Sequence, residues 1–231
     1  KTTGLFTSQV IPFIIQTDFE EADVESFLGE SMDFAHQLSI SNPVLSIRKP
    51  PTPFTTASLL QAASNELHMG PKETMRCAQT LYENGLITYM RTDCEKYSAE
   101  FLDSVVASLS SFQPLFARNI CTNLHRDLGS SSSEKAKTDE KASETGAAAH
   151  ESGAAAHEAI RPVNITIQNA EIKDASERVI KLYELIWTHT LESCMAPAQV
   201  HVLRAHISAP LDRKYAYSCE QVVVWGWKCV N

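Results

Sequence analysis

The chain has 231 residues, of which 43% are hydrophobic, an ordinary share for a protein that buries a core. Its 28 acidic and 20 basic side chains give a net charge of −8, which excludes a uniformly basic surface that coats a nucleic acid. No apolar run approaches the roughly 18 residues that span a bilayer. We therefore expect a globular, intracellular protein with no membrane segment.

Residues 1–48 combine strand-like and acidic stretches. The apolar, β-branched segment 5–15 predicts a strand, and an acidic run at 18–33 follows it. That run is either a solvated segment or a site for a divalent ion, and its spacing favours the solvated segment. Residues 44–47 predict another strand, after which three prolines within 50–53 form a stiff connector. We place the first domain boundary at this connector.

Apolar residues recur at helical spacing in three segments beyond the connector: 55–68, 72–84 and 99–111. Thr55 or Thr56 can cap the first predicted helix, and Gly85 ends the second. A short β-like segment, 86–89, precedes the third helix. This order of elements resembles that of winged-helix modules, which bind nucleic acids.

The remainder of the chain contains an insertion, a helix and further strands. Residues 129–153 have almost no large apolar side chain, which predicts a weakly ordered insertion. Residues 176–195 predict a long helix with one broad apolar face, and strands follow it. The expected fold class is α+β: a mostly helical, winged-helix-like domain, 49–197, inserted into a β-rich domain made of 1–48 and 198–231.

The six cysteines form no Cys-x-x-Cys pair, and their closest spacing is ten residues. A zinc site is therefore not expected. Without a secretory signal, reduced thiols are the simplest interpretation of Cys77, Cys94, Cys121, Cys194, Cys219 and Cys229.

The densest group of chemically active side chains lies in residues 85–93, GLITYMRTD. In an extended segment residues two apart share a face, so Tyr89 and Arg91 are expected on the same side. A phenol with a free pKa of about 10 needs a nearby cation to act as a nucleophile at neutral pH, and arginine supplies one. The spacing is also compatible with a half-buried strand tyrosine beside a surface arginine.

Three motifs in this order resemble those of the type IA DNA topoisomerases: PFTT at 53–56, GLITYMRTD at 85–93 and AHEAIRP at 156–162. The resemblance continues into 181–187 and the Gly-Trp pair at 226–227. It covers most of the chain from about Val44 onward, whereas the first forty residues match only weakly.

Details of the motifs are closest to the bacterial topoisomerase I branch. Met90 stands where the topoisomerase III branch typically has proline, and the HEAIRP sequence points the same way. Two features depart from the family pattern. Cys94 replaces a common serine, and a duplicated insertion precedes His157. Only His157, and not His150, is followed by Glu-Ala-Ile-Arg-Pro, so we take His157 as the functional histidine.

The resemblance implies a transesterification. Tyr89 would attack single-stranded DNA and become joined to the 5′ phosphate, another strand would pass, and resealing would relax negative supercoils. Arg91 would hold the scissile phosphate and ease ionisation of Tyr89. His157 would contact the phosphate or join a proton network, although a surface histidine after a loop is the simpler alternative. Candidate DNA contacts are Arg161, Thr55 and Thr56.

The resemblance also implies parts that are not recognisable here. The family carries a Toprim domain that binds Mg²⁺ and a further domain that grips a single strand. We therefore expect no metal site in this chain. The chain is expected to be the gate half of a larger protein: a hinge domain, 1–48 and 198–231, around an active-site tyrosine domain, 49–197. By itself it is expected to be inactive in relaxation.

Partners and alternatives complete the expectations. The expected partners are single-stranded DNA and the remainder of the same polypeptide, in a monomer. The alternatives are a topoisomerase III-like decatenase and a non-catalytic winged-helix DNA-binding module. The compartment stays open between the bacterial nucleoid or cytoplasm and a eukaryotic organelle or nucleus.

Overall fold

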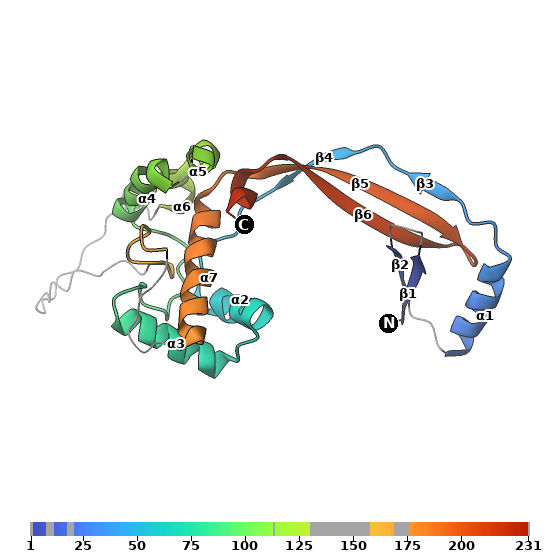
Figure 1. The fold of residues 1–231 in the computed structure, drawn as a ribbon, viewed down its shortest axis with the longest axis horizontal. Helices are drawn as coiled ribbons and strands as arrows, with labels where there is room; N and C mark the ends of the chain where they lie inside the picture. Colours follow the sequence, from blue (N-terminus) through green and yellow to red (C-terminus); the bar gives the residue numbers. More distant parts are fainter. Residues whose placement is uncertain are drawn as a thin grey trace, which may run out of the picture. The chain divides into compact units, whose positions relative to one another are not determined.

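The computed structural model describes residues 2–7, 12–17, 21–112, 114–129, 158–168 and 176–230. It divides into two compact units. The β-rich unit comprises Lys1–Arg48 and Ala198–Trp225, and the helical unit comprises Lys49–Pro197 and Gly226–Asn231 (Figure 1). The predicted α+β fold class is confirmed.

An antiparallel sheet forms the β-rich unit. Its hairpins are β1 (Thr2–Thr7) with β2 (Pro12–Thr17), and the long β5 (Ala198–Ala209) with β6 (Arg213–Val224). The strand order is β1-β2-β6-β5-β3, where β3 is Leu38–Ile40. The strand β4 (Val44–Arg48) also pairs with β5. The N-terminal and C-terminal strands therefore share one sheet. The single strand predicted over 5–15 is wrong, because this segment is divided between the antiparallel strands β1 and β2.

The helix α1 (Glu21–Met32) accounts for most of the acidic run. Phe27 is buried, and it belongs to a small core with side chains of β2, β5 and β6: Phe13, Ile15, Ala205, Ile207, Ala209 and Tyr215. The acidic side chains at 23, 25, 30 and 33 are exposed, as a solvated segment predicts. Asp18 and Glu20 lie outside the described residues. Among the described residues no group of three metal-binding side chains is found.

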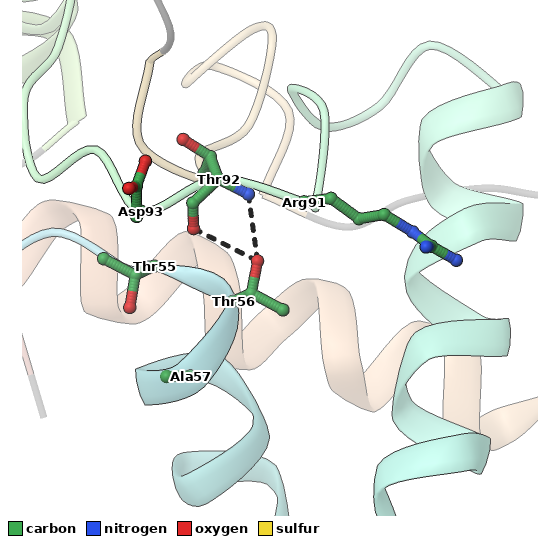
Figure 2. Close-up of a pocket in the computed structure, with 6 residues that line it drawn as sticks. All are labelled: Thr55, Thr56, Ala57, Arg91, Thr92 and Asp93. Atoms are coloured by element: carbon green, nitrogen blue, oxygen red, sulfur yellow. Dashed lines mark hydrogen bonds between the residues drawn. The ribbon is translucent and has the colours of Figure 1, made fainter.

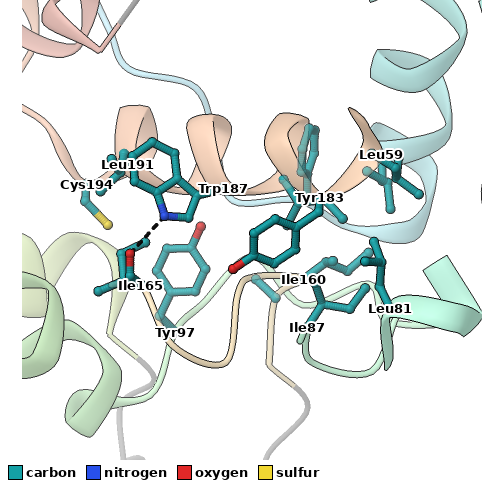
Figure 3. Close-up of a cluster of buried hydrophobic side chains, with 14 of the residues drawn as sticks. Leu59, Leu81, Ile87, Tyr97, Ile160, Ile165, Tyr183, Trp187, Leu191 and Cys194 are labelled. Carbon is teal, nitrogen blue, oxygen red and sulfur yellow. Dashed lines mark hydrogen bonds between the residues drawn. The ribbon is translucent and has the colours of Figure 1, made fainter. Parts of the chain in front are cut away.

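The helical unit contains α2 (Thr56–Leu67), α3 (Pro71–Glu83), α4 (Ala99–Phe112), α5 (Pro114–Asn119), α6 (Leu124–Leu128), α7 (Glu177–Cys194) and a 3₁₀ turn, Gly226–Cys229. The apolar face of α7 lies at the centre of its core (Figure 3). The Trp187 indole donates to the Ile165 carbonyl at 2.8 Å, and the Tyr183 hydroxyl donates to that of Ile167 at 2.6 Å. These bonds attach residues 165–167 to α7.

The four helices expected from periodicity are present within a few residues of their expected limits, whereas α1, α5, α6 and the 3₁₀ turn are not among the expected helices. The structure also differs from the expected division of the chain at its end. Gly226 takes a positive φ of 49°, and Trp227 donates its backbone N–H to the Ala196 carbonyl at 2.9 Å. The chain thereby leaves β6 and packs on the helical unit, whereas we had assigned 198–231 entirely to the β-rich part.

Two further expectations concern a membrane-spanning helix and the insertion before His157. No helix in the described ranges is long and apolar enough to cross a membrane. Residues 130–157 lie outside the described part of the chain. The expected insertion at 129–153, apart from Gly129, falls within that range, as do His150 and His157.

Candidate active site

Backbone hydrogen bonds bring the three motifs together. Residues 158–163, which comprise most of the third motif and Val163 after it, lie between the first and second motifs. On one side the Ile160 N–H donates to the Phe54 carbonyl at 2.8 Å. On the other the Val163 N–H donates to the Leu86 carbonyl at 2.9 Å, beside a bridge between Ile87 and Pro162. Segments more than 100 residues apart thus form one platform in the helical unit.

Thr88 ties the second motif to the third. Its backbone N–H donates to the Arg161 carbonyl at 2.9 Å, and its hydroxyl donates to the Ala159 carbonyl at 2.8 Å. The same hydroxyl accepts a bond from the Arg161 N–H at 3.0 Å. Sequence reasoning missed this role, because a threonine before the tyrosine carries no signal of a partner more than 70 residues away.

Exposure alternates along the residues that follow Thr88. Tyr89, Arg91 and Asp93 are exposed, whereas Met90 and Thr92 are buried. Tyr89 keeps 48% of its surface exposed. The segment is not a strand, since the backbone bends at Met90 and Arg91, but its two buried residues anchor it and leave the side chains of Tyr89 and Arg91 exposed. The pair is therefore accessible to a ligand.

An open pocket of about 570 Å³ lies at the N-terminus of α2 (Figure 2). Arg91 extends towards one side of it, and Asp93 and Thr55 lie at the other. A helix N-terminus attracts anions, because its first N–H groups lack intrahelical acceptors. The pocket is lined by Thr55, Thr56, Ala57, Arg91, Thr92 and Asp93.

The two threonines expected to contact DNA have different roles here. Thr55 caps α2 in a capping box with Ser58, and its hydroxyl accepts the Ser58 N–H at 3.3 Å. The Thr56 hydroxyl donates to the Met90 carbonyl at 2.8 Å and accepts the Thr92 N–H at 2.9 Å. Thr56 therefore fixes the tyrosine segment to α2. This bonding does not favour the expected DNA contact for Thr56, whereas Thr55 stays a candidate.

Arg161 is buried rather than free to contact a ligand. Its Nε and Nη2 donate to the two carboxylate oxygens of Glu158 at 2.7 and 2.8 Å, and its Nη1 donates to the Pro162 carbonyl at 2.9 Å. The guanidinium also lies 4.0 Å from the centre of the Phe101 ring. Because these partners occupy it from several sides, the structure does not favour the DNA contact expected for Arg161 and instead indicates a structural role.

Glu158 links this ion pair to the start of α4. Its Oε1 accepts the backbone N–H of Ser98 at 2.7 Å in addition to the bond from Arg161. The Ala159 N–H donates to the Lys96 carbonyl at 2.8 Å. The glutamate in the third motif thus holds that segment in place, a role that the motif alone did not indicate.

His189 is a second side chain that sequence reasoning missed. Its ring stacks on Phe54, with ring centres 3.5 Å apart and planes at 6°. Its Nε2 donates to the Thr52 carbonyl at 2.8 Å, and burial lowers the pKa of the imidazole, which favours the neutral ring. From its place on α7, His189 therefore orders the segment that leads into α2.

Two nearby tyrosines are weaker candidates for the nucleophile from the sequence alone, because Tyr82 is expected to pack in the core from the apolar face of its helix and Tyr97 has no arginine two residues away. Tyr97 is fully buried, its hydroxyl lies 3.0 Å from the Ser193 hydroxyl, and burial raises its pKa. The expectation that Tyr82 packs in the core is wrong, because 41% of it is exposed. The core-facing residues of that helical turn are Ala78 and Leu81, and position 82 points about 100° away from position 81.

The described residues do not locate the metal ion or the histidine that the resemblance implies. The described residues provide no ligand set for Mg²⁺. His157 lies outside the described range, and its role stays a prediction.

An exposed tyrosine, an arginine two residues further on and a helix N-terminus are together typical of a site that binds and attacks phosphodiesters. A family model described as DNA topoisomerase matches residues 19–231, and the chain belongs to this family. The assignment to the type IA topoisomerases, made from three motifs, is confirmed.

The relatives are enzymes named DNA topoisomerase 1. The one from Synechococcus elongatus is 34% identical over 156 residues, which cover 68% of this chain and 15% of the relative. The one from Escherichia coli is 36% identical over 151 residues, 65% of this chain and 15% of the relative. A mimivirus enzyme, "DNA topoisomerase 1 type prokaryotic", is 31% identical over 198 residues, 84% of this chain and 20% of its own length. The chain thus spans about a fifth or less of these relatives.

A solved structure has a similar fold. Full-length topoisomerase I from Thermotoga maritima superposes with a TM-score of 0.60 at 21% sequence identity, covering 99% of this chain and 33% of its own. At this identity the likeness concerns the fold alone.

Proposed function

We propose that this chain carries the nucleophile of a type IA DNA topoisomerase that cleaves one strand of single-stranded DNA. Tyr89 is the nucleophile. The observation that carries the proposal is the joint exposure of Tyr89 and Arg91 on a segment whose intervening residue is buried, next to the pocket at the N-terminus of α2.

In the proposed step the Tyr89 oxygen attacks the scissile phosphorus. The Tyr89 hydroxyl gives up its proton, the bond between phosphorus and the 3′ oxygen breaks, and the departing 3′ oxygen takes up one proton to become a hydroxyl, so that Tyr89 is joined to the 5′ phosphate with no net change in protons. One phosphate ester replaces another, so the reverse reaction reseals the strand without an external energy source. Passage of another strand before resealing relaxes negative supercoils.

The groups around the pocket suit the charge that develops in this step. The positive charge and planar donors of the Arg91 guanidinium stabilise the phosphorane and the phenolate. The Ala57 N–H, in the first turn of α2, has no intrahelical acceptor and lies at the pocket. Together with Thr55, these groups bind the phosphate. His157 is proposed as a further phosphate contact or as part of a proton network.

The whole reaction extends beyond these residues. A Toprim domain of the same polypeptide supplies the Mg²⁺ site and another domain grips the single strand, while the β-rich unit acts as the hinge of the gate. Relaxation rather than decatenation is proposed because Met90 and the HEAIRP sequence match the topoisomerase I branch.

The test replaces Tyr89 with phenylalanine in the full-length protein. A single-stranded oligonucleotide labelled at its 3′ end is incubated with each protein, and covalent adducts are captured under denaturing conditions. Tyr89→Phe should form no adduct while binding the oligonucleotide normally, because only the hydroxyl is lost. Tyr82→Phe is the matched control and should retain the adduct. Undiminished adduct in Tyr89→Phe would place the nucleophile elsewhere.

The adduct assay, together with relaxation and decatenation assays, distinguishes the alternatives. A non-catalytic DNA-binding module would form no adduct even with Tyr89 present. A topoisomerase III-like enzyme would form the adduct but would decatenate linked circles more efficiently than it relaxes supercoils.

A further inference from the structure

A second exposed aromatic ring lies against the proposed nucleophile. The rings of Tyr82 and Tyr89 have centres 5.3 Å apart and planes at 68°. This is the edge-to-face arrangement that aromatic pairs prefer. Both rings are substantially exposed, at 41% and 48%. The contact therefore lies at the surface, where core packing does not force it.

The backbone on the α3 side of this contact is rigid. Gly85 adopts a φ of 68° and reverses the chain after α3. Its N–H donates to the Tyr82 carbonyl at 2.9 Å, and the Leu86 N–H donates to the Leu81 carbonyl at 3.0 Å. Leu81 is fully buried. Tyr82 thus stands on a helical turn that is held from both the core and the following loop.

On the Tyr89 side the backbone is held by its neighbours, whereas the phenol has a single ring contact among the described residues. Thr88 is bonded to Arg161, and Met90 is buried, so both neighbours of Tyr89 are fixed. Among the described residues no hydrogen bond reaches the Tyr89 hydroxyl, and the one ring contact recorded for Tyr89 is with Tyr82. A half-exposed side chain without such a contact would exchange between rotamers.

We infer that Tyr82 is a positioning residue for Tyr89: its ring holds the phenol in one orientation for attack on the phosphate. This inference rests on the proposed role of Tyr89 as the nucleophile. Orientation of the reacting group lowers the barrier because less conformational freedom is lost in the transition state. The ring of Tyr82 is required for this role, and its hydroxyl is not.

The test compares Tyr82→Phe and Tyr82→Leu in the full-length protein. The cleavage rate is measured in single turnovers at saturating 3′-labelled oligonucleotide, and the oligonucleotide Kd is measured separately. Tyr82→Phe should cleave at the original rate. Tyr82→Leu should cleave about two- to twelvefold more slowly with an unchanged Kd, as expected for loss of one aromatic pair. Trp225→Leu, at an exposed aromatic of the β-rich unit, should change neither value.

Other outcomes would overturn the inference. A weaker Kd with an unchanged saturated rate in Tyr82→Leu would mean that Tyr82 stacks on a base of the DNA. Loss of cleavage in Tyr82→Phe would mean that its hydroxyl takes part in the chemistry. An unchanged rate and Kd in Tyr82→Leu would remove any role for Tyr82.

An NMR measurement keeps this inference separate from the proposed function. The ring-proton resonances of Tyr89 should shift in Tyr82→Leu and stay in place in Tyr82→Phe, whatever the activity. If Tyr89→Phe still forms the adduct, the proposed function fails even when Tyr82→Leu shifts the Tyr89 resonances. If Tyr89→Phe abolishes the adduct while Tyr82→Leu leaves the Tyr89 resonances and the rate unchanged, only the positioning role fails.

Discussion

Arg91 is the residue whose chemical type matters most beside Tyr89. It is exposed at the pocket and has no carboxylate partner among the described residues, in contrast to Arg161, whose guanidinium is committed to Glu158. An unpaired arginine keeps its planar set of donors for a phosphate, and a lysine at the same position would offer only a point charge.

We predict that Arg91→Lys impairs cleavage more than binding. The positive charge remains, so the Kd for a single-stranded oligonucleotide should change by less than about threefold. The saturated cleavage rate should fall about tenfold or more, because charge-assisted bonds to the phosphorane are lost. Single-turnover cleavage and filter binding on the same oligonucleotide measure both values. Equal losses in rate and affinity would contradict the assigned role.

The buried tyrosines lead to a prediction about alkaline pH. Burial raises the pKa of Tyr97, and it raises that of Tyr183 to about 12. An unfolded phenol ionises at about pH 10. Because the folded state holds these protons more tightly, their contribution to stability is complete below about pH 10 and is lost progressively as the pH rises from there through the folded-state pKa. The urea midpoint should therefore fall above about pH 10.

Tyr97→Phe tests the assignment of this effect. At neutral pH the variant should lose about 1 kcal/mol of stability, because the bond to the Ser193 hydroxyl is removed. Its urea midpoint should also fall less steeply with alkaline pH than that of the unmodified chain. A parallel decline would show that Tyr97 does not contribute. Cys194, whose pKa burial raises to about 12, adds to the slope in both proteins.

Among the elements, an ion pair within the third motif connects this segment to the start of α4. Glu158 and Arg161 join the start of α4 to the strand-like segment that carries Ile160. The arginine and glutamate side chains are only 11% and 20% exposed. A nearly buried charge that loses its partner is costly, so the two residues should depend on each other.

A double-mutant cycle should detect this dependence. Arg161→Met leaves Glu158 without its main partner and should cost about 3–5 kcal/mol of stability. Glu158→Gln should cost less, because an amide oxygen can still accept the Ser98 N–H. The double variant should be more stable than the sum of the two losses predicts. Additive losses in urea unfolding would argue against a coupled pair.

At the scale of the whole molecule, the described residues hold the groups of the proposed cleavage step. These are the proposed nucleophile, an arginine and a helix N-terminus, and no group of three metal-binding side chains is found among the described residues. The 231-residue polypeptide corresponds to about a fifth or less of the relatives it matches. A complete cycle of cleavage, passage and resealing needs more than these groups.

We therefore predict that the purified 231-residue chain folds but does not relax DNA. A negatively supercoiled plasmid incubated with it and Mg²⁺ should keep its distribution of topoisomers on an agarose gel. The full-length protein is the positive control, and its Tyr89→Phe variant is the negative control. Relaxation by the 231-residue chain would contradict the prediction and would place the missing groups within it.

Much of the fold follows from local patterns in the sequence. The helices near 56, 71, 99 and 177 were expected because apolar spacing, caps and Gly85 act within a few residues of one another. The short helices α5 and α6 and the turn at Gly226 were not expected. Segments of four to six residues carry little periodicity, and tertiary packing decides whether they become helical.

The sequence by itself determined the family and the candidate nucleophile, because Tyr89, Arg91 and their neighbours lie in one short motif. Only the tertiary structure decided which charged and aromatic side chains are available. Arg161 is held by Glu158, and Tyr82 is exposed beside Tyr89 rather than buried. Exposure and pairing depend on residues far apart in the chain, since desolvation and hydrogen bonding act through space, and a motif does not record the neighbours that folding brings to it.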